Sequence, residues 1–436
     1  MPLVRPFRAL RYAPDVVADL ATVVAPPYDV IGPEEHRRLL ERDPRNVVRL
    51  DLPVADPRDD PDDQYRRAAR LLSTWRTDGT LHRDPRPALY PYEQTYRVPG
   101  SDVEHVRRGV FARVRLESFG PDAGIRPHER TLAGPKEDRY RLLRATGVNT
   151  SPVIGLYDDV SGRVPAWLND VSTTAPLAEV TDDDGVQHRL WMVAGDPELL
   201  VGICGAIGVG VITLADGHHR YETALRYRDE RMTGAADLED PAWAEILMLL
   251  LEPTAGPLTV LPTHRVLRGL GEAEVAALES GIGELFEIES RPGRAELIER
   301  FRPDGAAGGD GRFGFWTAAG GLVLRAKRPA FEPWLPAGGA ALRRLDVTLA
   351  AVALERLAGI DAAAVAEGSR IAYTKDPVEA IAWVDSGHDG ATAALLLEPT
   401  PAAEIAAVAA DGDVMPQKST YVYPKALTGL VINPLE

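Results

Sequence analysis

The sequence predicts an α+β protein with two domains, residues 1–268 and 269–436, on three observations. Its 436 residues are enough for two or three domains of ordinary size. Up to about residue 268, segments that alternate apolar and polar residues are mixed with segments whose apolar residues recur at helical spacing. Beyond about residue 270, helical patterns and strand-then-helix units dominate. Both halves are therefore expected to combine helices with strands.

Local signals define the elements of the first half. Gly32-Pro33 before an acidic turn predicts a helix start, and residues 64–79 carry a helical apolar repeat that ends at Gly79. Residues 87–98 and 108–119 alternate in polarity around a Pro-Gly turn, which predicts paired strands. The same signals predict a helix within 130–147, strands within 151–159, 188–195 and 209–215, a helix at 221–232, and a strand pair formed by 244–253 and 258–267.

The second half is expected to hold a strand–helix repeat and a hairpin. Its predicted elements are helices within 272–286, 294–301 and 342–359, a hairpin at 311–326, and strand-then-helix units at 370–387 and 391–412. The Gly-rich segment at 303–311 is expected to be a flexible loop.

Composition limits the classes of function. A formal net charge of −16 repels nucleic acids and anionic membranes, and the basic residues are interspersed with acidic ones. The single cysteine, Cys204, excludes an intrachain disulfide and a Cys-based zinc site, and its apolar context predicts buried packing. No apolar run approaches 18 residues, and the N-terminus lacks the apolar core of a signal peptide. We expect a soluble, cytoplasmic protein with no nucleic-acid or membrane partner; a homodimer is compatible with this.

The segment Asp216-Gly217-His218-His219-Arg220 is the strongest candidate for chemistry. It joins a predicted strand to a predicted helix, so free backbone N–H groups at the helix start favour an anion. Arg220 can contact phosphate in bidentate fashion, and Asp216 can hold Mg²⁺ through oxygen. The alternative is structural: Asp216 as an N-cap, Gly217 as a turn residue and the basic residues as an exposed first turn.

Four further segments are weaker candidates. Glu129, next to His128 in the charged segment 125–131, is placed to act as a general base, or it belongs to a solvated turn. Near the C-terminus, ammonium and hydroxyl groups could bind phosphate, or the tail only docks; these groups belong to Lys418, Ser419 and Thr420. The Pro-Pro turn at 25–30 and the pair His264-Arg265 either line the same pocket or are structural.

Several of these segments resemble one known family. The chain resembles the domain-of-unknown-function family ten-fifteen over residues 3–436. The segments that carry the resemblance, in order, are VRPFRAL with APPYDV, HERT followed by KEDR, ADGHHRYETAL, LPTHRV and MPQKSTYVYPKALTGLVINPL. More distantly, DGHHR before a helix resembles the turn of the ParB/sulfiredoxin-like superfamily. Free serine kinases in that superfamily also carry an upstream Pro-His-Glu, which residues 127–129 match. The first domain is therefore expected to be ParB-like, with a strand-rich insertion around 157–205 that lengthens the separation between Glu129 and Asp216.

The distant resemblance implies a phosphotransferase that uses a nucleotide, ATP or ADP, and Mg²⁺. By this resemblance Glu129 is the catalytic base on a substrate hydroxyl. The nucleotide phosphates and Mg²⁺ are then held by the turn at Asp216, Gly217, His218, His219 and Arg220, with His128 beside it. The acceptor is expected to be a small hydroxylated metabolite, free L-serine first, and dephosphorylation of phosphoserine uses the same groups. The alternatives are a ParB-like nucleotide-binding regulator and a non-catalytic protein that binds a phosphorylated metabolite.

Overall fold

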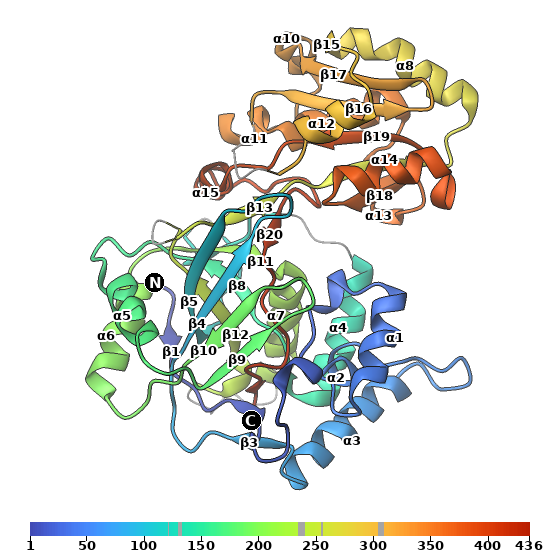
Figure 1. Cartoon of the computed structure of the whole chain (residues 1–436). Coiled ribbons are helices and arrows are strands. Elements are labelled where there is room, and N and C mark those ends of the chain that lie inside the picture. Colours follow the sequence, from blue (N-terminus) through green and yellow to red (C-terminus); the bar gives the residue numbers. More distant parts are fainter. Residues whose placement is uncertain (121, 130–132, 234–239, 254–255, 304–308) are drawn as a thin grey trace.

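The computed structural model describes residues 1–120, 122–129, 133–233, 240–253, 256–303 and 309–436. It contains two units, each built on its own sheet (Figure 1). The first sheet has nine strands in the order β6-β11-β8-β12-β5-β4-β10-β9, with β1 paired to β5. Its strands are β1 (Val4–Arg5), β4 (Tyr90–Arg97), β5 (Glu104–Arg115), β6 (Ile125–Arg126), β8 (Val153–Leu156), β9 (Ala178–Thr181), β10 (Gln187–Leu190), β11 (Ile212–Asp216) and β12 (Glu245–Leu251).

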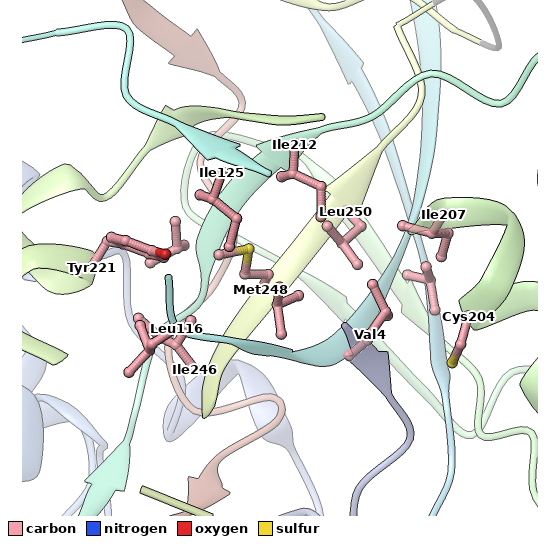
Figure 2. Close-up of a cluster of buried hydrophobic side chains, with 14 of the residues drawn as sticks. Val4, Leu116, Ile125, Cys204, Ile207, Ile212, Tyr221, Ile246, Met248 and Leu250 are labelled. Carbon is pink, nitrogen blue, oxygen red and sulfur yellow. The ribbon is translucent and has the colours of Figure 1, made fainter. Parts of the chain in front are cut away.

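Helices pack around this first sheet and bury its apolar faces. They are α1 (Pro33–Arg42), α2 (Val48–Asp51), α3 (Asp63–Thr77), α4 (Ala133–Thr146), α5 (Arg163–Ser172), α6 (Pro197–Ile207) and α7 (His218–Met232). Figure 2 shows one cluster in which Ile212 of β11 and Met248 of β12 lie among side chains from β6, α6 and α7. Every residue of β12 is buried, because β5 and β8 flank this strand on its two sides.

The second unit is built on a six-stranded sheet in the order β15-β17-β16-β19-β14-β18, and all of its strand pairs are antiparallel. The strands are β14 (His264–Arg268), β15 (Phe286–Ser290), β16 (Arg312–Thr317), β17 (Gly320–Ala326), β18 (Ile371–Thr374) and β19 (Ala391–Leu397). The helices are α8 (Glu272–Leu285), α9 (Arg294–Arg300), α10 (Arg328–Phe331), α11 (Ala340–Arg344), α12 (Asp346–Ala358), α13 (Ala362–Glu367), α14 (Pro377–Ser386) and α15 (Ala402–Ala410).

Residues 411–436, which we call the strap, return from the second unit to the first. Two strand pairs fix the strap, β20 (Tyr421–Tyr423) with β13 (Thr259–Leu261) and β21 (Asn433–Pro434) with β7 (Val148–Asn149). The buried Arg107 donates to the carbonyl oxygens of Tyr423, at 3.1 Å, and Pro424, at 2.5 Å. Leaving those carbonyls unpaired would be costly, so the strap is an integral part of the first unit. A short pair of β2 (Leu10–Tyr12) and β3 (Leu81–Arg83) completes the described strands.

The α+β class is confirmed, as are most of the elements predicted from pattern. The predicted pairing of 244–253 with 258–267 is wrong, because β12 already has partners on both sides and β13 pairs with the strap instead. The helix predicted within 342–359 is two helices, because Leu345 between them is extended. The segment 157–205, predicted to be strand-rich, holds two helices as well as two strands. The second sheet already includes β14, so it begins before the predicted boundary at residue 268.

Candidate active site

A cavity of about 640 Å³ lies where the first unit, the second unit and the strap meet. The first unit contributes the turn after β11, the segment after β6 and the turn around Tyr28. The second unit contributes residues of β18 and α14 and Lys375 between them, and the strap contributes a run that includes Lys418 and Lys425. Of the ten predicted site residues, only Ser419 does not line this cavity in the described part of the chain.

The pairing of β6 with β11 explains how two distant motifs meet. These strands are parallel neighbours, with Ile125 beside Ile212 and Arg126 beside Thr213. Parallel neighbours end at the same edge of a sheet, so the residues that follow both strands emerge together. Glu129 follows β6 and Asp216 ends β11, and both line the cavity.

Glu129 is a carboxylate held by the strap. Its Oε1 accepts a hydrogen bond from the backbone N–H of Lys418 at 2.7 Å, and its Oε2 accepts one from Ser419 at 3.3 Å. The side chain is only 17% exposed. Burial raises the pKa of Glu129 to about 7, although the two N–H donors and the ammonium of Lys418 pull it down. A carboxyl group with this pKa is suited to accept a proton near neutral pH.

Asp216 is bound by two cations. Its Oδ1 lies 2.5 Å from Nζ of Lys425, and its Oδ2 lies 2.8 Å from Nη2 of Arg220. Burial alone would raise the pKa of Asp216, but the ammonium of Lys425 and the guanidinium of Arg220 outweigh it and hold this pKa well below its usual range. Arg220 also donates to the carbonyl oxygen of Pro152. Together, Asp216, Lys425 and Arg220 carry a net positive charge beside the cavity.

The turn between β11 and α7 is shaped for an anion. Gly217 is the N-cap of α7 with φ +84°, and as a glycine it brings no side chain that could cap the helix. A Cβ at Gly217 would meet the guanidinium of Arg220 at 3.0 Å, so both the backbone and the close approach favour glycine. His219 lines the cavity, where burial and then the charge of Lys418 lower its pKa.

Two histidines lie together behind this turn with their rings 4.6 Å apart. His128 is fully buried; its Nδ1 contacts the carbonyl oxygen of Leu214, and its Nε2 lies 2.9 Å from Oγ1 of Thr420. The backbone N–H of His128 donates to Nε2 of His218 at 3.3 Å. Burial lowers the pKa of His128 to about 4, and burial also holds the pKa of His218 well below its usual value. Both rings are therefore neutral at pH 7 and position the turn instead of adding charge.

The structure separates the weaker candidates. The hydroxyl of Ser419 donates to the carbonyl of Pro416 at 2.5 Å, so its backbone N–H is the part that reaches the site. The ring nitrogens of His128 are both occupied, which leaves neither for a phosphate. His264 is buried away from the cavity, whereas Arg265 donates to the carbonyl of Lys418 at 3.3 Å.

The Pro-Pro turn and the HERT motif differ in whether the structure places them at the cavity. Tyr28 and Asp29 of the Pro-Pro turn line the cavity. Arg130 and Thr131 of the HERT motif lie outside the described residues.

Two lysines were missed as site residues. Lys425 lies in a stretch that the sequence singled out, but nothing in the sequence shows that it pairs with Asp216. Lys375 comes from the second unit, between β18 and α14, and no motif marks it. For Lys425, the only signal in the sequence was the density of aromatic and basic residues in the strap.

The predicted Mg²⁺ ligand does not by itself make a metal site. Both oxygens of Asp216 contact cations, and no cluster of three His, Cys, Asp or Glu side chains in the described ranges is arranged to hold a metal ion. Mg²⁺ commonly binds through one or two carboxylates together with substrate phosphates. The side chains at Asp216 do not fit a protein-held Mg²⁺ in this arrangement, so no chemical step is assigned to one.

The family of the chain follows from comparison with family models. Residues 4–348 match the family described as Protein of unknown function (DUF1015), and the chain belongs to it, as the motifs predicted. The strap and its Lys-Ser-Thr motif lie beyond the matched residues. A search of curated proteins found no match.

Solved structures show distant likeness. The chain is similar to a free serine kinase in complex with AMP, at 14% identity and a TM-score of 0.38, over 75% of this chain and 90% of that one. A conserved hypothetical protein from Pyrococcus furiosus is similar at 13% identity and a TM-score of 0.36, over 69% and 88%. SbnI with a C-terminal truncation, from Staphylococcus aureus, is similar at 11% and 0.35, over 73% and 87%. The ParB/sulfiredoxin-like label stays a prediction. Among the described helices, none has the length and apolar character that crossing a membrane requires.

Proposed function

We propose that this protein is a nucleotide-dependent phosphotransferase that acts on the hydroxyl group of a small metabolite, with free L-serine as the first candidate. One observation carries the proposal: a buried carboxylate with a pKa of about 7, Glu129, lines the same cavity as the start of α7, which has glycine as its N-cap and lies beside cations. Phosphoryl transfer needs positioning and charge neutralisation more than covalent chemistry from the protein, and this cavity offers both.

In the proposed reaction, Glu129 takes the proton of the acceptor hydroxyl. The acceptor oxygen then forms a bond to the terminal phosphorus of ATP or ADP, while the bond from that phosphorus to the bridging oxygen breaks and leaves the shortened nucleotide. The backbone N–H groups at the start of α7 and the cations Arg220 and Lys418 stabilise the charge on the phosphate oxygens. The reverse reaction, dephosphorylation of phosphoserine, would use the same groups.

The test is a product assay with the full chain. The protein is incubated with ATP or with ADP and with a panel of hydroxy acids and hydroxylated amino acids that includes L-serine, with Mg²⁺ or with EDTA, and products are identified by mass spectrometry. Phosphoserine, or another phosphorylated acceptor, is the expected product. A panel that yields no phosphorylated product with either nucleotide, together with no transfer of the phosphoryl group from phosphoserine to ADP or AMP, contradicts the proposal.

The hydrogen bonds of Glu129 to the strap also favour a second candidate, a non-catalytic protein that binds a phosphorylated metabolite. In that case Glu129 serves only to hold Lys418 and Ser419 in place. Thermal shift with phosphoserine and with nucleotides detects the binding that both functions predict. Only the enzyme predicts turnover, so stabilisation by a ligand without any product would identify the binding protein. A ParB-like regulator that binds DNA has less support, because the net charge of −16 opposes it.

A further inference from the structure

Two ammonium groups meet at one aromatic ring in the cavity. Nζ of Lys425 lies 4.4 Å from the ring centre of Tyr421, and Nζ of Lys375 lies 4.9 Å from the same centre. Lys375 also donates to the hydroxyl of Tyr421 at 3.5 Å and lies 5.7 Å from the ring centre of Tyr423. All four residues line the cavity.

The two lysines differ in their partners. Lys425 is 10% exposed and spends one of its three N–H donors on Asp216. Lys375 forms no ion pair with any residue in the described part of the chain, and its contacts are with tyrosines. Asp29, Glu35, Asp182, Asp184 and Glu379 also line the cavity, but no ion pair joins any of them to Lys375. Asp216 pairs with Lys425 and not with Lys375, so both ammonium groups keep N–H donors for an anion beside the ring of Tyr421.

The position of these lysines relates them to the phosphate-binding turn. Asp216 ends β11 and contacts both Lys425 and Arg220, so the ammonium of Lys425 lies next to the start of α7. A phosphate at that helix start would meet Lys425 on the side of the strap, and the chain of phosphates would continue toward Lys375. Asp216 then orients a cation of the protein, which is the opposite of the role of a metal ligand.

We propose that Lys375 and Lys425 form the subsite for the phosphate chain of the ligand, and that they supply the positive charge that Asp216 was expected to bring through Mg²⁺. The proposal rests on the proposed function for the identity of the ligand as a nucleoside di- or triphosphate. Because Lys375 belongs to the second unit and Lys425 to the strap, the bound phosphates join the two units.

The test measures binding of inorganic tripolyphosphate to the full chain by isothermal titration calorimetry, first in EDTA and then in Mg²⁺. Binding is expected in EDTA. Lys375→Met and Lys425→Met are each expected to weaken it about tenfold, the loss of one hydrogen bond to a charged group. Lys327→Met is the matched control, because Lys327 lies in the second unit outside the cavity and donates to the carbonyl of Gly283. It should leave the affinity unchanged.

Binding that requires Mg²⁺ and is unaffected by both lysine variants would overturn the proposal. If Lys425→Met fails to fold because Asp216 loses a partner, Lys375→Met decides, since Lys375 has no ion pair to lose. The proposed function can fail independently of this subsite. If tripolyphosphate binds through these lysines but no acceptor is phosphorylated, the anion subsite stands and the kinase function is contradicted. If an acceptor is phosphorylated but binding does not depend on the lysines, the kinase function stands and the subsite is contradicted.

Discussion

Replacement of Glu129 by Gln removes the proposed proton acceptor while keeping nearly the same shape. A general base contributes about 100- to 10 000-fold to a rate, so kcat is expected to fall by a factor in that range. Nucleotide affinity should stay within a few fold, because the anion-binding turn is untouched. The wild-type kcat/KM should rise with pH around a midpoint of about 7, where Glu129 loses its proton, and the residual activity of the variant should lack this midpoint.

The same substitution makes a prediction about stability. The pKa of Glu129 rises from 4.5 to about 7 on folding, which corresponds to about 3 kcal/mol in favour of the protonated form. This contribution is fully present below pH 4.5 and is lost as the pH rises through about 7. Glutamine does not titrate, so wild type should lose about 3 kcal/mol of unfolding free energy relative to Glu129→Gln between pH 4.5 and pH 8.

Two measurements check this reasoning. Initial rates over pH 5.5–9 with saturating nucleotide test the base, with nucleotide affinity followed by calorimetry. Urea unfolding of both proteins at several pH values tests the burial. A variant that keeps its rate within threefold, or a wild-type rate that does not rise between pH 5.5 and pH 9, refutes the role of Glu129 as base. If the difference in unfolding free energy between wild type and Glu129→Gln does not change with pH, folding does not raise the pKa of Glu129.

Three further changes test the surroundings of the site. Asp216→Asn leaves two buried cations without their carboxylate, so it should lower the unfolding free energy by about 3 kcal/mol. Urea titration measures this loss, and a loss below about 1 kcal/mol would mean that the charges are solvated. Gly217→Ala should lower the unfolding free energy by about 1–2 kcal/mol, since φ is +84° and the new Cβ approaches Arg220. The control Gly205→Ala, inside α6, has open space for its Cβ and should be neutral or stabilising. Equal effects of the two substitutions would contradict backbone strain at Gly217. Cys204 is buried with its pKa raised to about 12, so it should react with a thiol reagent only in urea, and fast labelling of the folded chain would show otherwise.

Local patterns predicted the elements well because each element carries its own signals. The helix start at Gly32-Pro33, the turn between β4 and β5, and the strand-turn-helix at Asp216 are specified by neighbouring residues. Pairing partners are not specified in this way. The sequence placed 244–253 next to 258–267 because they are adjacent in the chain, but β12 is a central strand whose sides are filled by β5 and β8.

The candidate site shows the same division. DGHHR and Glu129 could be singled out by residue type and by resemblance, but their meeting depends on the parallel pairing of β6, a two-residue strand, with β11. So short a strand leaves no periodic pattern in the sequence. The neutral state of His218 was also hidden, because it depends on burial beside His128, which residue type does not reveal.

The strap connects these observations to function. It holds Glu129 through the backbone of Lys418 and Ser419, and it neutralises Asp216 through Lys425. One segment therefore sets both the protonation of the proposed base and the charge of the anion-binding turn. Arg107 fixes the strap to the first unit, so the position of the strap determines the contacts of both groups. The site of this chain is consequently a property of the whole fold, and the first unit without the strap would lack the ammonium group that contacts Oδ1 of Asp216.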